Sequence, residues 1–339
     1  MLITGVLIVV LVATGALYQF IGERRGLRLH EPPGTTIDVD GQGLHVVCAG
    51  VGGPDVLFES GIAASSLSWA HVMPEIAVLT RACAYDRAGL GWSAPTRGPR
   101  TVARMLQELR GVLKHSAPTG SHVLVGHSFG AFLVCAYAAR YSAEIAGLVV
   151  LDPPGEWLEI TPQRRRILQG GRLLARLGGG LARVGIVRAC LALLTGGAPG
   201  VPRNFVRIFG PTVALTLERL VGEVRKLPPE VHPLVQMLWC RPKCFRAMAD
   251  HFDLLPELAA TVAGVKTLGD ISLVVVSSGD QPVEIVAGHR ELAGLSSKGR
   301  HIVASRSGHW IQFDEPDLVV AAVRDLVGAW RSAHDGAGR

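Results

Sequence analysis

The stretch that most limits how this chain can fold is 123–137, an apolar run interrupted by Gly-His-Ser-Phe-Gly. A serine on a tight turn from a strand into a helix needs very small neighbours, because the turn brings the two backbones together, and Gly126 and Gly130 meet that need. The turn would lift the hydroxyl of Ser128 above the sheet and put the N–H of Phe129 at a helix N-terminus, where negative charge is stabilised. We therefore predict Ser128 as a nucleophile and Phe129 as an oxyanion donor.

Strand and helix patterns alternate through most of the chain. The range 36–49 alternates in polarity around Asp40-Gly41, which predicts a β-hairpin. Further strands are predicted at 56–59, 82–85, 122–127, 147–151, 272–277 and 301–304, and helices at 67–79, 101–115, 129–141, 282–295 and 316–330. Such alternation is typical of βαβ units, which indicates an α/β fold with a mostly parallel central sheet flanked by helices.

The alternation stops between 153 and 268. This segment is rich in Leu, Arg, Gly and Pro, has helical spacing and contains no convincing strand pattern. We interpret 153–268 as an inserted helical cap on a core formed by 35–152 and 269–332, with a C-terminal tail at 333–339.

The N-terminus carries an apolar segment of membrane-spanning length. Residues 2–21 include no charged side chain and are followed by Glu23, Arg24, Arg25 and Arg28. We predict a transmembrane anchor at 1–22 and a linker at 23–34. A cleaved signal peptide is the alternative, but it would have a basic start and a shorter apolar run. By the positive-inside rule the arginines keep the catalytic part cytoplasmic, with membrane lipid as a partner.

The net charge of +6 at pH 7 is concentrated in the predicted cap. The segment that holds it contains Arg164, Arg165, Arg166, Arg172, Arg176, Arg183 and Arg188 and is nearly free of acidic residues. Because no nucleic-acid-binding motif or aromatic interleaving accompanies these arginines, we expect no nucleic-acid partner and favour an anionic membrane surface. A solvated face of the cap helices is the alternative explanation.

The cysteines Cys48, Cys83, Cys135, Cys190, Cys240 and Cys244 are scattered, and their layout is not that of a disulfide framework. Cys83 and Cys135 lie in apolar runs, where free thiols pack as small hydrophobic groups. Cys240 and Cys244 could form half of a metal site or a disulfide, but no second pair of ligands lies near them. We expect no metal and no cofactor.

A serine nucleophile needs a histidine base and a carboxylate that holds the imidazole. His309 follows the last predicted strand, in the order Ser, acid, His that is typical of open α/β sheets, although it could also be an ordinary surface histidine. His127, next to the serine, is interpreted as a structural turn residue. Ser128, His309 and the candidate acids all fall at the carboxyl ends of strands, where such sheets bind ligands.

Two aspartates compete for the role of the acid. Asp280 lies in Ser-Ser-Gly-Asp-Gln-Pro after a predicted strand, a sequence that also fits a plain turn. Asp152 ends an apolar strand, where a carboxylate is costly unless it is paired, and His309 would be its natural partner. We favour Asp152 and keep Asp280 as the alternative.

The second oxyanion donor is expected in the loop after the strand at 56–59. Gly61 allows a close backbone approach there, so the N–H of Ile62 is the candidate. The glycine-rich loop 86–93 lacks both a following Lys-Ser/Thr and the G-x-G-x-x-G spacing, so we interpret it as a loop that shapes the site, without a phosphate-binding role.

These segments together resemble the α/β-hydrolase superfamily over 36–330 outside the cap. The range 58–62 resembles its oxyanion loop, with Ser60-Gly61 where many members have His-Gly. The range 85–93 resembles the loop after the fourth strand, 125–130 the nucleophile elbow and 307–309 the histidine loop. A further resemblance to bacterial membrane-anchored members, in which an aspartate ends the strand before the cap, implies Asp152 as the acid.

The resemblance implies a serine hydrolase, with esterase and lipase-like members as the nearest type. A serine nucleophile argues against the dehalogenase and epoxide hydrolase activities of relatives that use aspartate. We expect a small-molecule ester as substrate, apolar or lipid-like because the cap is apolar and an anchor precedes it. An amidase or iminopeptidase is the enzymatic alternative, and a ligand-binding protein that keeps the fold without turnover is the alternative from another class.

Overall fold

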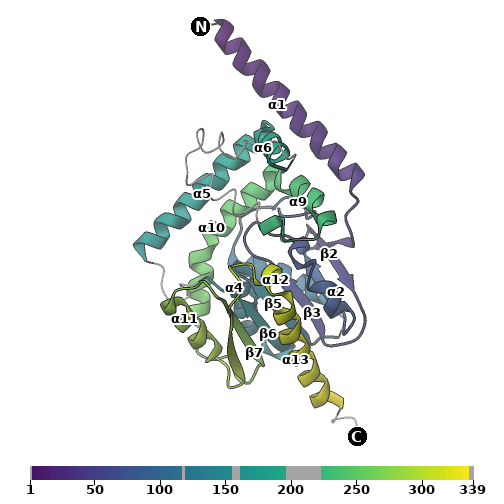
Figure 1. Ribbon diagram of the computed structural model, residues 1–339, viewed down its shortest axis with the longest axis vertical. Coiled ribbons are helices and arrows are strands. Elements are labelled where there is room, and N and C mark those ends of the chain that lie inside the picture. Colours follow the sequence, from purple (N-terminus) through teal and green to yellow (C-terminus); the bar gives the residue numbers. More distant parts are fainter. Residues whose placement is uncertain (1, 117–118, 155–160, 196–222, 336–339) are drawn as a thin grey trace.

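The computed structural model describes residues 2–116, 119–154, 161–195 and 223–335. Its centre is an eight-stranded sheet in the order β1-β2-β4-β3-β5-β6-β7-β8 (Figure 1). β1 and β2 form the antiparallel hairpin, β2 is antiparallel to β4, and the strands from β4 to β8 run parallel. The bounds are β1 Thr35–Val39, β2 Gln42–Ala49, β3 Asp55–Glu59, β4 Ala82–Tyr85, β5 His122–His127, β6 Ile145–Leu151, β7 Leu273–Ser278 and β8 Gly299–Ala304.

Helices cover both faces of the sheet. One hydrophobic core packs beneath the helices α3 Val102–Ser116, α4 Phe129–Arg140 and α11 Val283–Ala293. The other core packs beneath α2 Met73–Ala77 and α13 Pro316–Asp335, and the short helix α12 Ile311–Asp314 leads into α13. β3 and β5, which lie at the middle of the sheet, are buried along their whole length, as their continuous apolar sequence predicts.

Between β6 and β7 the described residues form helices and turns and no strand. The helices are α5 Pro162–Arg183, α6 Ile186–Thr195, η3 Pro229–Val231, α9 His232–Trp239 and α10 Pro242–Ala263. α10 packs against both α5 and α4, so it connects the inserted helices with the helix that follows Ser128. Part of this segment, at 155–160 and 196–222, lies outside the described residues.

Two predicted elements differ from the structure. The helix predicted over 67–79 is two pieces, the 3₁₀ turn η1 Ser66–Trp69 and α2, because Pro74 has no N–H for the interior of a helix and fits only its first turn. The linker predicted at 23–34 is helical for most of its length. α1 runs over Leu2–Leu29, since nothing breaks a helix before Pro32 and Pro33.

The prediction that Cys83 is a free thiol is wrong. Cys83 forms a disulfide with Cys48, whereas Cys135 is a buried free thiol, as expected. Cys48 on β2 lies directly opposite Cys83 on β4. The sequence hides this pair, because β2 and β4 are neighbours in the sheet but are separated along the chain by β3.

Candidate active site

Ser128 stands on a strained turn between β5 and α4. Its backbone has φ 54° and ψ −119°, a conformation that is sparsely populated by residues other than glycine. A Cβ on Gly130 would lie 2.4 Å from the carbonyl oxygen of Glu59, and one on Gly126 would lie 2.6 Å from that of Gly130. The two glycines therefore permit the close approach that the sequence pattern predicted.

Asp152 and His309 meet beside this turn. The Nδ1–H of His309 donates to Oδ2 of Asp152 at 2.7 Å. Asp152 is fully buried after β6, and it also accepts from the N–H of Ser278 at 3.0 Å and from Nε2 of Gln281 at 2.9 Å. Burial on its own would raise the pKa of Asp152, but these hydrogen bonds, that from His309 first, outweigh burial and lower it. The carboxylate therefore stays ionised and holds the imidazole.

Asp280, the alternative acid, lies elsewhere in the same loop region. It is exposed, and its Oδ1 accepts from the hydroxyl of Ser278 at 2.8 Å. A Cβ on Gly308 would be 3.8 Å from its Oδ2, so Asp280 borders the histidine loop. The carboxylate in hydrogen-bond contact with His309, however, is that of Asp152.

His127 fixes the histidine loop from the side of the elbow. Its ring is fully buried, lies 4.7 Å from the ring of His309 between centroids, and has its Nε2 2.8 Å from the main-chain carbonyl oxygen of His309. Burial first, and the neighbouring His309 second, lower the pKa of His127 to about 3. The ring is therefore neutral, and because its partner is a carbonyl oxygen, Nε2 carries the hydrogen.

The loop that carries Ile62 lies against Ser128. A Cβ on Gly61 would be 3.3 Å from the Cβ of Ser128, which places the loop at the nucleophile position. Nη2 of Arg87 donates to the carbonyl oxygen of Gly61 at 2.5 Å, and Nη1 of Arg87 donates to the carbonyl oxygen of Ser60. In a trans peptide the carbonyl and the next N–H point in opposite directions, so the N–H of Ile62 is directed away from Arg87.

Arg87 belongs to a buried cluster that also reaches the elbow. Its guanidinium pairs with Glu59, which in turn accepts from the hydroxyl of Tyr85. The guanidinium lies 5.2 Å from the ring centroid of Phe129, and its Nε donates to Nε2 of His251 on α10 at 3.4 Å. Burial raises the pKa of Glu59, with Arg87 opposing the shift, whereas burial and Arg87 both lower the pKa of His251.

The sequence placed Arg87 in a glycine-rich loop without a phosphate-binding role, and it did not single out His251. It identified 86–93 as a loop that shapes the site, yet Arg87 makes its contacts with residues of the neighbouring strand end. One feature of the sequence could have predicted this contact. Glu59 and Arg87 carry opposite charges at the ends of two buried strands, and neither charge could be buried alone. Nothing in the sequence indicated that His251, far along the inserted segment, would contact this pair.

A small apolar cavity of about 30 Å³ adjoins the site. It lies between η1 and α9 and is lined by Ala64, Leu67, Val235, Trp239, Trp310 and Phe313 together with polar residues. Trp310 follows His309, and Ala64 follows the loop that carries Ile62, so the cavity borders both of these loops.

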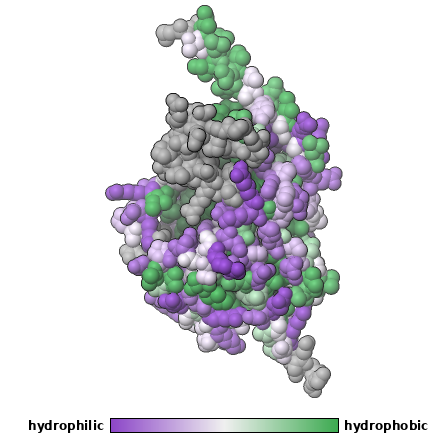
Figure 2. All heavy atoms as spheres, in the orientation of Figure 1, coloured by the Kyte–Doolittle hydropathy of each residue, from purple (hydrophilic) through white to green (hydrophobic). Residues whose placement is uncertain are grey.

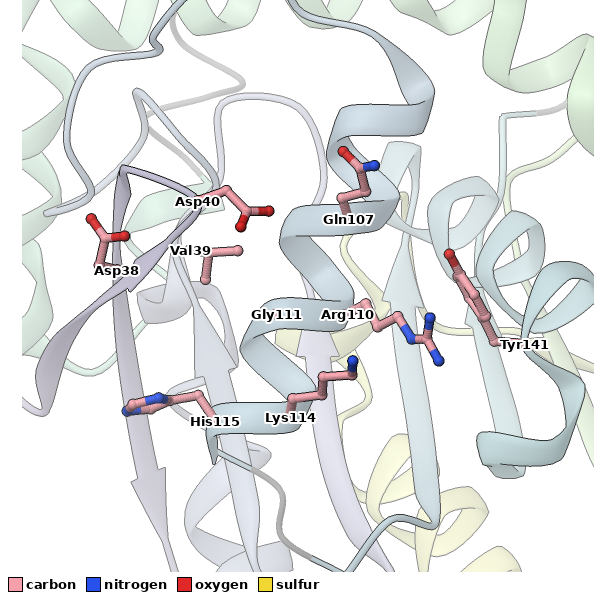
Figure 3. Close-up of a pocket in the computed structure, with 9 residues that line it drawn as sticks. All are labelled: Asp38, Val39, Asp40, Gln107, Arg110, Gly111, Lys114, His115 and Tyr141. Carbon is pink, nitrogen blue, oxygen red and sulfur yellow. The ribbon is translucent and has the colours of Figure 1, made fainter.

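A larger hollow, about 490 Å³, lies away from the elbow (Figure 3). Its lining includes Tyr141, which follows the far end of α4, about 18 Å from Ser128 at 1.5 Å per helical residue. Arg110, in the same lining, is paired with Glu144. This hollow is therefore separate from the site around Ser128.

The structure gives no support to a metal site at Cys240 and Cys244. Both are buried free thiols, and burial raises the pKa of each to about 11. Within the described parts of the chain, no group of three or more His, Cys, Asp or Glu side chains could hold a metal ion.

The chain belongs to the alpha/beta hydrolase family, whose family model matches residues 56–322. The uncharacterized protein YqjL of Bacillus subtilis is 34% identical over 298 residues, which cover 86% of this chain and 90% of that protein. Epoxide hydrolase A of Mycobacterium tuberculosis is 24% identical over 328 residues, which cover 87% of this chain and 97% of the relative. Together with the fold, these relatives identify the protein as an α/β hydrolase.

A solved structure has the same fold. A thermophilic esterase from Thermogutta terrifontis has a TM-score of 0.58 at 20% identity, over 87% of this chain and 97% of that chain. The names of this esterase and of epoxide hydrolase A state different reactions, so the shared fold does not by itself specify the reaction of this chain.

Proposed function

We propose that the protein is a serine hydrolase that cleaves a carboxylic ester with an apolar or lipid-like acyl group. The observation that supports this most strongly is the hydrogen bond between His309 and the buried, ionised Asp152, made beside a strained turn that carries Ser128. A serine at this turn suits acyl transfer through a covalent intermediate.

The reaction proposed has two halves. His309 removes the proton of the Ser128 hydroxyl as the oxygen attacks the ester carbonyl carbon, and Asp152 stabilises the imidazolium that forms. His309 then gives that proton to the leaving alcohol, which departs and leaves an acyl-enzyme. Water, deprotonated by His309, attacks the acyl carbon, and release of the acid restores Ser128.

The negative charge that develops on the carbonyl oxygen needs two donors. The N–H of Phe129 is at the first position of α4 and has no acceptor within the helix, and the N–H of Ile62 is turned away from Arg87. We propose that these two amides form the oxyanion hole and that Arg87 is the positioning residue that holds the second one in place.

We also propose that α1 tethers the enzyme to a membrane. Ile3–Leu29 has a mean hydropathy of 2.0 over its most apolar window, only 6% of which is buried, and its apolar end projects from the molecule (Figure 2).

Two features of the chain favour opposite orientations in the membrane. Arg24, Arg25 and Arg28 favour a cytoplasmic catalytic domain, whereas the disulfide between Cys48 and Cys83 is typical of an oxidising compartment. Thiol alkylation in intact cells distinguishes the two orientations. Cys48 and Cys83 stay unmodified if they form a disulfide in an oxidising compartment, and they are modified if they are reduced in the cytoplasm.

The nucleophile is tested with a fluorophosphonate probe, which phosphonylates activated serines. We expect the wild-type protein to be labelled and Ser128→Ala to be unlabelled, because Ser128 stands beside the hydrogen-bonded pair of His309 and Asp152. Ser332→Ala, on the exposed end of α13, is the matched control and retains labelling. A folded wild-type protein that resists the probe, or equal labelling of Ser128→Ala, would contradict the proposal and favour a non-catalytic ligand-binding protein.

The acid is tested by comparing Asp152→Asn with Asp280→Asn on a short-chain ester. Asp152→Asn would no longer stabilise the imidazolium and would favour the wrong tautomer of His309, so kcat should fall by about 10⁴. Asp280→Asn should keep kcat within a few-fold. The assignment of Asp152 is wrong if both variants show the same mild loss, or if Asp280→Asn shows the greater one, with folding checked by circular dichroism.

Arg87 is tested in a background that does not leave Glu59 as an unpaired buried charge. The double variant Glu59→Gln/Arg87→Met should lower kcat by about 10² with little change in KM, because the N–H of Ile62 would no longer be held in place and its hydrogen bond acts only on the transition state. Tyr85→Phe, which removes a hydrogen bond to Glu59 but leaves the contacts of Arg87 with the loop, is the control.

Arg87→Lys provides an independent comparison, since its ammonium keeps the charge but cannot reproduce the planar fork. Wild-type kcat in both the double variant and Arg87→Lys would exclude a positioning role for Arg87.

A further inference from the structure

The outward face of α5 carries a line of large apolar side chains. Ile167, Leu174 and Leu181 are spaced by seven residues, so they lie along one side of the helix, and Leu173 and Leu177 lie beside them. Their exposed fractions run from 38% at Leu181 to 65% at Ile167. These five residues are called the α5 stripe below.

The inward face of α5 is made of small residues. Ala175, Gly179 and Ala182 are buried, and a Cβ on Gly178 would lie 2.6 Å from the ring of Phe245 on α10. A helix of a soluble protein usually turns its large apolar residues to the core. In α5 the arrangement is reversed, because α10 approaches closely over the small residues and leaves the leucines outside.

The end of α5 is joined to the apolar N-terminal helix. A Cβ on Gly15 would lie 2.2 Å from the carbonyl oxygen of Val184, just after α5, and Nε of Arg188 on α6 donates to Oε1 of Gln19 at 2.9 Å. Gly15 is six residues before the end of the apolar segment 2–21, or about 9 Å along the helix. The end of α5 is therefore level with the last turns of the proposed membrane span.

The direction and the charge of α5 fit an interfacial helix. Figure 1 shows α5 running across the direction of α1, so a bilayer that α1 crosses would lie along α5. α5 contains no acidic residue, and four of its arginines are exposed: Arg165, Arg176 and Arg183 lie along one side of the α5 stripe, and Arg166 lies at its start, seven residues before Leu173. Arg176 also lies 3.8 Å from Asp253 on α10. Arginines beside an apolar face are the pattern of helices that bind anionic lipid.

We propose that α5 lies in the surface of an anionic bilayer, with the α5 stripe among the acyl chains and the flanking arginines at the headgroups. This inference rests on the proposed tether and deepens the proposed function. With α5 in the bilayer, the inserted helices that cover the elbow face lipid, and the ester that reaches Ser128 is one dissolved in the membrane.

The test uses the full-length protein in vesicles of phosphatidylcholine and phosphatidylglycerol. Leu174→Cys, made with Cys190→Ser to remove the one half-buried free thiol among the described cysteines, is labelled with an environment-sensitive fluorophore. Val78→Cys, at a side chain that is 85% exposed and far from α5, is the matched control in the same background. We expect acyl-chain quenchers to reduce the emission of the label at 174 and to leave the label at 78 unaffected.

Equal quenching at 174 and 78 would overturn the proposal. So would an apolar environment for the label at 174 that is insensitive to lipid quenchers, since that result means that a second protein copy covers the α5 stripe. This readout needs no enzymatic activity, so it can fail or succeed independently of the proposed ester hydrolysis.

A kinetic comparison tests the functional consequence. In Leu174→Glu/Leu177→Glu, the rate on a bilayer-dissolved ester divided by that on a water-soluble ester should fall by about tenfold or more, because two apolar side chains are lost from the proposed lipid contact. Val78→Glu should leave the ratio unchanged. An unchanged ratio in the double variant would exclude a role for the α5 stripe in delivering the substrate.

Discussion

The site depends on the buried guanidinium of Arg87. It compensates the charge of Glu59, binds the carbonyl oxygens of Ser60 and Gly61, and lies over the ring of Phe129. A single planar, five-donor group thus joins the ends of β3 and β4 to the start of α4. An unpaired charge in this position would be very costly, so Glu59 and Arg87 are stable here only as a pair, and we propose that this pair sets the orientation of the loop that carries Ile62.

A second set of contacts sets the position of the histidine. Asp152, held by the N–H of Ser278 and the side chain of Gln281, orients the ring of His309 from one side, while His127 holds the main chain of the same residue from the other. The strain at Ser128 is supported by close packing at Gly126 and Gly130. Groups that follow β3, β5, β6, β7 and β8 thus meet at the carboxyl edge of the sheet, where the proposed chemistry needs little rearrangement.

The positions of the strands along the chain and the elements around Ser128, Asp152 and His309 could be predicted, because apolar runs and their polar ends are local signals. What the sequence could not provide are contacts between elements that are distant along the chain. The pairing of Cys48 with Cys83 follows from the adjacency of β2 and β4, and the contact of His251 with Arg87 follows from the way α10 crosses α4. Likewise, the outward leucines of α5 have ordinary helical spacing, and only the packing of α10 against α5 distinguishes the inner face from the outer one.

The central claim, that Ser128 is an acylated nucleophile served by His309 and by two backbone amides, is tested most directly by the crystal structure of the phosphonylated protein. We expect phosphorus bonded to Oγ of Ser128, its non-ester oxygen within about 3 Å of the amide nitrogens of Ile62 and Phe129, and the hydrogen bond between His309 and Asp152 intact. A phosphonyl group on another residue, or an oxygen that points away from both amides, would contradict the account.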